Sequence, residues 1–222
     1  MSTCVSTVFA LEGPDVESPY NRQMIAAVLA LQATDARTIY KRVSPAICTV
    51  TQSVMKGEST GTGFAVNGGW QIVTASHVVP SEWGEIQVSG RIKCALVYRD
   101  READVAILRP SRKLPYSIAL AKREPEIGAT VFSVGQALGA LENTMVSGMF
   151  NGRRVVEGEA MYQHSAPLSS GMSGGPLLDE SGLVIGVNKY KTAENAGLNF
   201  SSTLPALRKA IKDAAGIVRS EI

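Results

Sequence analysis

Ten short β-rich segments follow one another between residues 45 and 190, and turn residues separate them. They are rich in Val, Ile, Thr, Tyr and Phe, which favour strands, and they read AICTVTQ, GTGFAV, WQIVTAS, EIQVSG, CALVYRD, VAILRP, ATVFSVG, NTMVSGMF, AMYQHSA and LVIGVNKY. Turn signals such as Asn67-Gly68-Gly69 and Asn151-Gly152 lie between them. Regularly spaced short strands predict an all-β fold of the sandwich or barrel type.

The strand-rich region is interrupted near its middle. The segment RPSRKLPY, residues 109–116, contains two prolines and three basic residues and breaks the apolar pattern. The sequence therefore predicts two β units joined by a linker.

Helical spacing of apolar residues is found towards the two ends of the chain. Residues 21–42 place Met24, Val28, Leu31 and Ile39 at such spacing, which predicts a leading helix. Near the other end, Ser202 or Thr203 can cap a helix with Pro205 in its first turn. Its apolar face, which we expect to cover the β units rather than to bind a membrane, consists of Leu207, Ile211, Ala214, Ala215 and Val218.

Composition and charge limit the partners. The 22 basic and 20 acidic residues are scattered along the chain, so no basic face implies a nucleic-acid partner. No apolar run approaches the ~20 residues of a membrane span. The first 15 residues carry no positive charge, unlike a secretory signal, so an uncleaved cytoplasmic protein is expected.

The cysteines do not indicate a disulfide framework or a metal site. Cys4, Cys48 and Cys94 are an odd number at wide spacing, and no C-x-x-C pair is present. We expect incidental or buried thiols, and we expect no metal or cofactor.

A glycine-rich stretch around Ser173 is a candidate nucleophile site. Gly171-Met172-Ser173-Gly174-Gly175 matches G-x-S-x-G, the nucleophile turn of α/β-hydrolases, in which the histidine follows the serine. The chain has only two histidines, His77 and His164, and both precede Ser173. The α/β-hydrolase interpretation therefore fails.

The order histidine, aspartate, serine remains open, and it defines another class of serine hydrolase. His77 ends the apolar segment IVTASHVV, and Asp104 precedes the apolar segment VAIL. The loop around Ser173 allows the amides of Gly171 and Ser173 to point at one oxyanion. Ser169 and Ser170 are weaker candidates because neither has a glycine two residues before it.

The segments TASHVV, DVAIL and GMSGGPLLDESGLVIGVN together resemble trypsin/chymotrypsin-like serine peptidases, and most closely the bacterial HtrA (Deg-type) and glutamyl-endopeptidase-like branch. The resemblance covers about residues 40–215. It implies two six-stranded antiparallel β-barrels of the chymotrypsin type, with a helix at each end. The expected parts are a partly helical extension over 1–40, a first barrel over 41–112 with His77 and Asp104, a second barrel over 113–203 with Ser173, and a C-terminal helix over 204–222. Only 49 residues follow Ser173, so no PDZ domain is expected there.

By this resemblance, the chain is a serine endopeptidase acting on a protein or peptide. His77 is the base, Asp104 orients it, Ser173 attacks the peptide carbonyl, and the amides of Gly171 and Ser173 bind the oxyanion. The pocket for the residue before the scissile bond is expected to involve Pro167, Leu168, Val187, Asn188 and Lys189. An apolar lining favours small or medium aliphatic residues such as Val, Ala or Leu, because a charged side chain would be buried without a partner.

Three further expectations accompany this interpretation. His164 is expected to be a half-buried strand residue near the pocket, and it or Lys189 could reach the substrate. Met172 stands where the digestive enzymes have an aspartate that pairs with a new amino terminus, so no activating cut is expected. The competing hypothesis is a non-catalytic peptide-binding or scaffold protein that keeps the fold. The sequence pattern favours no particular oligomeric state.

Overall fold

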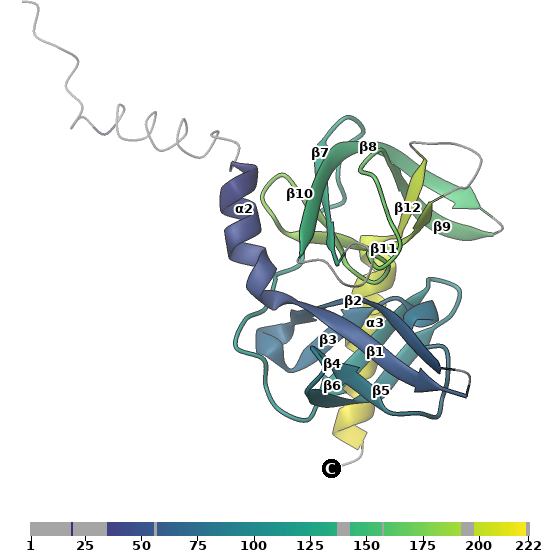
Figure 1. Ribbon diagram of the computed structural model, residues 1–222. Coiled ribbons are helices and arrows are strands. Elements are labelled where there is room, and N and C mark those ends of the chain that lie inside the picture. Colours follow the sequence, from purple (N-terminus) through teal and green to yellow (C-terminus); the bar gives the residue numbers. More distant parts are fainter. Residues whose placement is uncertain are drawn as a thin grey trace, which may run out of the picture. The chain divides into compact units, whose positions relative to one another are not determined.

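Two closed antiparallel β-barrels make up most of the computed structural model (Figure 1). The structure describes residue 19 and residues 35–55, 57–136, 143–156, 158–191 and 198–220. Much of the predicted leading helix, and Cys4, lie outside these residues. Within them, the all-β prediction of two six-stranded barrels with an N-terminal and a C-terminal helix is confirmed.

The first barrel contains the strands β1 Ile47–Val54, β2 Gly57–Val66, β3 Gln71–Thr74, β4 Ile86–Val88, β5 Ile92–Asp100 and β6 Val105–Pro110. They follow the order β1-β2-β3-β6-β5-β4, and pairing of β1 with β4 closes the barrel. Short 3₁₀ turns precede β1 and follow β2 and β3, at Ser44–Ala46, Asn67–Gly69 and Ser76–Val78. The last of these turns carries His77 and lies at the end of β3.

The second barrel contains β7 Thr130–Gly135, β8 Thr144–Val156, β9 Glu159–His164, β10 Pro176–Asp179, β11 Val184–Lys191 and β12 Asn199–Ser202. The order is β10-β11-β12-β9-β8-β7, closed by pairing of β10 with β7. The loop of Ser173 joins β9 to β10, so it lies between two strands of this barrel.

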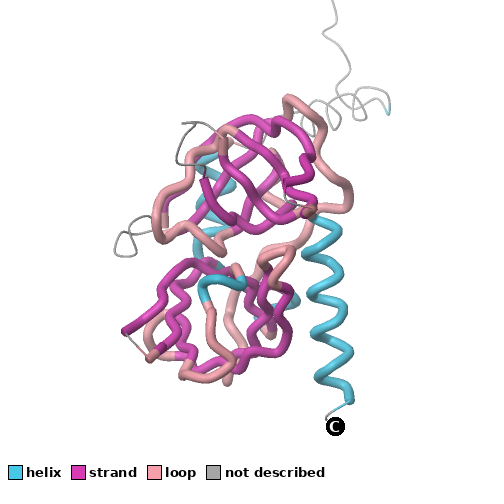
Figure 2. The backbone as a smooth tube through the Cα atoms, turned by 90° about the vertical axis from the view of Figure 1, so that its right-hand side faces the viewer, coloured by secondary structure: helices cyan, strands magenta, loops and turns pink. Residues whose placement is uncertain are grey.

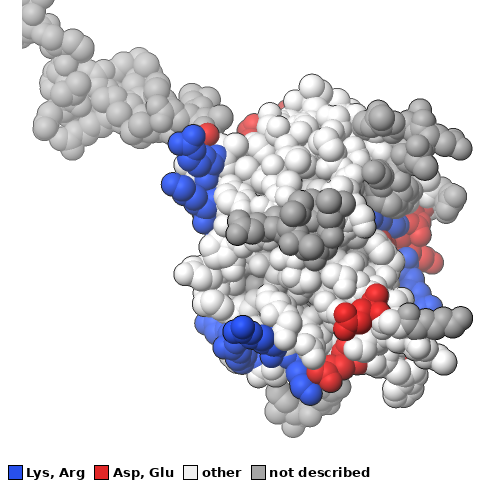
Figure 3. All heavy atoms as spheres, in the orientation of Figure 1, with Lys and Arg blue, Asp and Glu red and all other residues white. Residues whose placement is uncertain are grey.

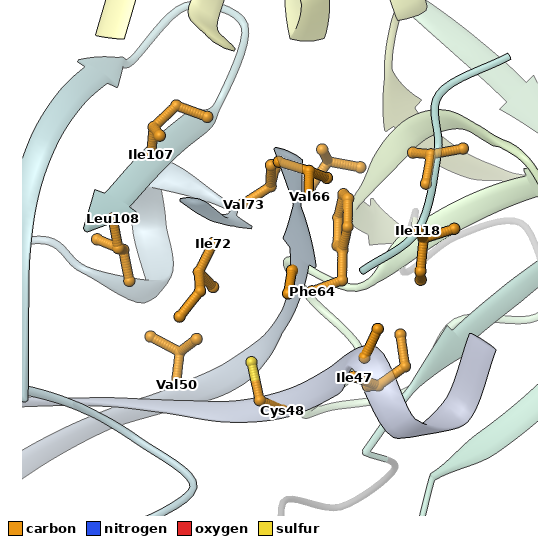
Figure 4. Packing of buried hydrophobic residues seen from close by; sticks show 14 of the residues in the cluster. Ile47, Cys48, Val50, Phe64, Val66, Ile72, Val73, Ile107, Leu108 and Ile118 are labelled. Atoms are coloured by element: carbon orange, nitrogen blue, oxygen red, sulfur yellow. The ribbon is translucent and has the colours of Figure 1, made fainter. Parts of the chain in front are cut away.

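The interior of the first barrel is filled by alternating apolar side chains. Figure 4 shows Val50 of β1, Ile72 of β3 and Leu108 of β6 turned towards one another, and all three are completely buried. Burying each such side chain stabilises the fold by ~1.5–3 kcal/mol. The second half of β2 is buried on both faces. One face meets this core. Beyond it, Thr62 bonds to Ser173 of the second barrel and Ala65 bonds to Ile118 of the segment between the barrels.

The segment between the barrels packs against both of them. The Leu114 amide donates to Gly69 O at 3.0 Å and the Ile118 amide to Ala65 O at 2.9 Å, both in the first barrel. The Ala121 amide donates to Val184 O of β11 at 2.9 Å. The predicted linker around residues 109–116 therefore begins a connection that fixes one barrel against the other.

The two helices described in full are α2, Ala36–Val43, and α3, Leu204–Ser220. The buried face of α3 includes Leu204, Leu207, Ala210 and Ala214. The helix contacts β5, β6 and β11, and its long axis runs down the side of the lower barrel in Figure 2. Lysine and arginine side chains gather over α2 on the face in Figure 3, where Arg37, Lys41 and Arg42 are exposed. None of the helices in the described ranges has the length and apolar character needed to cross a membrane.

Candidate active site

His77 and Asp104 form a direct, two-point contact at the edge of the first barrel. His77 Nδ1 lies 2.7 Å from Asp104 Oδ2, and the His77 backbone N–H donates to Asp104 Oδ1 at 2.9 Å. The Asp104 side chain is 8% exposed and that of His77 is 49% exposed. The carboxylate is thus shielded while one edge of the imidazole remains open to solvent.

The position of Asp104 follows from the turn that it ends. This turn joins β5 to β6, and Asp104 has a φ of +54°, a conformation that aspartate tolerates better than most residues. Its carbonyl accepts the Ser76 N–H at 3.2 Å, and Asp100 Oδ1 accepts the Ala103 N–H at 2.9 Å. The turn therefore attaches the carboxylate to the segment that carries His77.

Thr62 of β2 attaches the Ser173 loop to the first barrel. Its backbone N–H donates to Ser173 O at 2.8 Å, and its Oγ1 donates to Gly171 O at 2.6 Å. The same Oγ1 accepts the Gln136 N–H at 2.9 Å. Thr62 was not singled out in the sequence, although it belongs to the predicted strand GTGFAV.

Glycines allow the two barrels to approach closely at this place. A methyl group on Gly61 would lie 2.6 Å from Val78 Cγ2 and 2.9 Å from Ser173 O. A methyl group on Gly174, whose φ is +83°, would lie 2.2 Å from Thr62 O. The Ser173 loop therefore packs directly against β2, and Gly61 of β2 also packs against Val78 in the turn that contains His77.

The backbone of the Ser173 loop is ordered by internal bonds. The Met172 amide donates to Ser169 O at 3.1 Å and the Gly174 amide to Asn188 O at 2.8 Å. Among the described residues, the amides of Gly171 and Ser173 make no such backbone bond. Met172 is 2% exposed and fills the space behind the loop. The Ser173 hydroxyl donates to Lys189 O at 3.2 Å.

The residues expected in the substrate pocket have different environments. Pro167 is exposed, whereas Leu168 is 7% exposed and Val187 is 1% exposed. Asn188 is completely buried, and its Nδ2 donates to Val134 O at 3.2 Å. The Lys189 Nζ donates to Glu159 Oε2 at 2.6 Å and to Glu102 O at 3.2 Å. The Asn188 and Lys189 side chains are thus engaged within the protein.

His164 is completely buried, which corrects the expectation of a half-buried residue. It ends β9, and its Nε2 lies 2.9 Å from Ser201 Oγ of the paired strand β12. Burial lowers the pKa of His164 to about 4, an effect partly offset by the backbone of Ala166. His164 is therefore neutral at neutral pH.

The described cysteines are free thiols, and the described residues form no metal site. Cys48 is a buried free thiol and Cys94 a half-buried one. Burial raises the pKa of the Cys94 thiol to about 12. Within the described ranges, no group of three or more His, Cys, Asp or Glu side chains is placed to hold a metal ion.

The sequence pattern that defines the trypsin-like peptidase domain matches residues 61–187, more than half of the chain. The chain belongs to the trypsin-like peptidase family. The matched range includes His77, Asp104 and Ser173, and it spans parts of both barrels.

Curated relatives of the chain include Deg-type proteins, which confirms the predicted resemblance to the HtrA (Deg-type) branch. Protease Do-like 1, chloroplastic, from Arabidopsis thaliana is 27% identical, over 90% of this chain and 53% of the relative. A probable periplasmic serine endoprotease DegP-like from Chlamydia trachomatis is 30% identical, over 66% of this chain and 31% of the relative. The chain spans about half or less of the length of these relatives.

A solved structure shares the two-barrel fold of this trypsin-like domain. The Rv3671c protease from M. tuberculosis, in its active form, superposes with a TM-score of 0.70 at 22% sequence identity. The match covers 78% of this chain and 82% of that chain.

Proposed function

We propose that the chain is a serine endopeptidase in which His77, Asp104 and Ser173 form the catalytic triad. The observation that carries the proposal is the two-point contact of Asp104 with His77, beside a Ser173 loop that packs on the same barrel. A non-catalytic scaffold has no physical need for a shielded carboxylate bound to a half-exposed imidazole. Membership of the trypsin-like family supports the same function.

In the proposed reaction, the Ser173 hydroxyl turns from Lys189 O towards His77, which accepts its proton through Nε2. Ser173 Oγ attacks the substrate carbonyl, and the protonated imidazole then gives the proton to the leaving amine. Asp104 holds Nδ1 in its protonated form and stabilises the imidazolium. In the second half of the reaction, His77 takes a proton from a water molecule that attacks the acyl carbon, and it returns this proton to Ser173 Oγ as the acyl–oxygen bond breaks. No cofactor is required.

The amides of Gly171 and Ser173 are the proposed donors to the oxyanion. Neither donates a backbone bond among the described residues, whereas the Met172, Gly174 and Gly175 amides do. The Thr62 hydroxyl holds the carbonyl of Gly171. Donors fixed in advance stabilise a developing oxyanion strongly because they need no reorganisation during the reaction.

The endopeptidase is further proposed to prefer Val, Ala or Leu immediately before the scissile bond. Lys189 is paired with Glu159 and His164 is neutral and buried, so neither offers a cation to an acidic substrate side chain. Asn188 and Asn199 use polar atoms to bind the backbone at Val134 and Leu168. Apolar contacts with Leu168 and Val187 then determine which substrate residue is accepted before the scissile bond. A charged substrate side chain would lack a partner there.

The direct test is digestion of a proteome-derived peptide library, with the new termini identified by mass spectrometry. The chain should produce cleavage after small or medium aliphatic residues, and folded Ser173→Ala should produce none. Cleavage mainly after Lys, Arg, Glu or Asp would overturn the preference but not the activity. Binding of peptides without any cleavage would favour the scaffold hypothesis.

A cytoplasmic location stays a proposal. The two free thiols Cys48 and Cys94 are compatible with a reducing compartment. Fractionation of cells that make the chain from its native gene would test it, and recovery outside the cytoplasm would contradict it.

A further inference from the structure

Lys189 touches both halves of the proposed active site through different atoms. Its carbonyl accepts the Ser173 hydroxyl at 3.2 Å. Its ammonium donates to Glu102 O at 3.2 Å, in the turn that ends at Asp104. One residue of β11 thus joins the nucleophile candidate in the second barrel to the acid candidate in the first.

The turn contacted by Lys189 determines where the Asp104 carboxylate lies. Glu102 is two residues before Asp104, whose left-handed φ of +54° requires support from neighbouring bonds. The bond from Ala103 to Asp100 acts within the turn. The bond from Lys189 is different because it comes from the other barrel and fixes the turn relative to Ser173.

Glu159 holds the Lys189 ammonium in this position. The Glu159 Oε2 and Lys189 Nζ are 2.6 Å apart, and the lysine side chain is only 11% exposed, against 29% for the glutamate. Glu102 and Glu159 also line an open hollow of about 350 Å³, so Glu159 is the solvent-facing partner. A mostly buried ammonium needs such a partner to offset the loss of its hydration.

We propose that Lys189 is a positioning residue for catalysis and that Glu159 acts through it. The pair keeps the turn of Asp104 in register with Ser173, so that the imidazole of His77 is oriented towards the serine hydroxyl. This inference rests on the proposed serine endopeptidase function. The pair is not expected to contact the reacting atoms of the substrate through its charged groups.

The test is a double-mutant cycle on peptide hydrolysis with Lys189→Met, Glu159→Gln and the double variant. Lys189→Met should lower kcat about tenfold with KM changed less than twofold, and Lys189→Arg should restore most of kcat. The double variant should lose no more than Lys189→Met alone, because Glu159 has no other path to the site. When two residues act as a unit, the effects of their substitutions on kcat do not add, whereas the effects of independent residues do.

A second lysine–carboxylate pair provides the matched control. Lys93 Nζ and Glu85 Oε1 are 3.3 Å apart and both side chains are exposed, so Lys93→Met should leave kcat within twofold of the parent chain. Thermal melting shows whether each variant is folded at the assay temperature. Glu159→Gln changes a side chain that is only half-buried, so it remains informative if Lys189→Met is unstable.

Different results overturn the inference and the proposed function. An active parent chain with unchanged kcat in folded Lys189→Met, or in Glu159→Gln, would overturn the inference alone. Additive losses in the double variant would also overturn it. An inactive parent chain would overturn the proposed function instead.

Discussion

Asp104 binds His77 with both carboxylate oxygens, one at the imidazole Nδ1 at 2.7 Å and the other at the backbone N–H at 2.9 Å. Asp104→Asn should keep the fold, since an amide oxygen can still accept one of these bonds. It should lower kcat by a factor on the order of 10⁴, because the amide no longer stabilises the required tautomer and the imidazolium. Steady-state hydrolysis of a peptide substrate measures the change.

The control for Asp104→Asn is Asp213→Asn, which removes an exposed carboxylate on α3. Its kcat should equal that of the parent chain. Equal kcat in Asp104→Asn and the parent would exclude Asp104 as the orienting residue.

The Thr62 hydroxyl connects the first barrel to the backbone of Gly171. Thr62→Val preserves the side-chain shape but leaves Gly171 O and the Gln136 N–H without this partner. We expect a loss of about 1–3 kcal/mol in the free energy of unfolding and a fall in kcat of roughly tenfold or more, because an oxyanion donor is less well fixed. Urea titration and hydrolysis assays measure the two effects.

Thr60→Val is the matched control, since Thr60 lies in the same strand but is exposed. It should change neither stability nor kcat appreciably. A Thr62→Val variant that behaves like Thr60→Val would show that this hydroxyl does not order the loop.

The buried His164 makes stability depend on pH. Burial lowers its pKa from 6.5 in the unfolded chain to about 4 in the folded chain. Above pH 6.5 both states are neutral and the residue contributes no pH dependence. Between pH 6.5 and 4 the unfolded chain takes up a proton that the folded chain excludes, so stability falls by about 3 kcal/mol as the pH decreases.

His164→Gln keeps a polar group near Ser201 but removes the titration. Unfolding free energies measured from pH 7 to pH 4 should decline less in this variant than in the parent chain. Parallel curves for the two proteins would mean that His164 does not cause the decline, since carboxylates titrate equally in both.

Met172 lies behind the Ser173 loop and is 2% exposed. A thioether has no charge to pair with a newly formed ammonium, so ordering of the loop by a cut amino terminus is not expected. The intact chain should be active, and its kcat should resemble that of a chain starting at Asp35. Intact-mass spectrometry combined with hydrolysis assays checks this, and activity found only after truncation or self-cleavage would contradict it.

The strands and the triad candidates could be predicted because their signals are local, whereas the closure into two six-stranded barrels was implied by the resemblance to a family. Each strand has its own apolar pattern, and His77, Asp104 and Ser173 lie in short motifs at spacings of 27 and 69 residues. The contacts of Thr62 with Gly171 and of Lys189 with Glu102 join residues 109 and 87 positions apart. Such contacts arise only when the barrels pack, and no periodicity in the chain encodes them.

The burial of His164 was misjudged for a similar physical reason. A histidine in a strand with alternating polarity is compatible with either an open or a covered face. Its actual environment depends on pairing with β12 and on Ser201, which supplies a partner for Nε2. The sequence alone does not show that partner.

The most direct test of Ser173 as the nucleophile is reaction with a fluorophosphonate, followed by mapping of the adduct by peptide mass spectrometry. We expect one adduct, on Ser173 Oγ, that is absent in Ser173→Ala, strongly slowed in His77→Ala and retained in Ser170→Ala. An intact folded chain that is not labelled, or a folded Ser173→Ala variant that is labelled as fast as the parent, would contradict it.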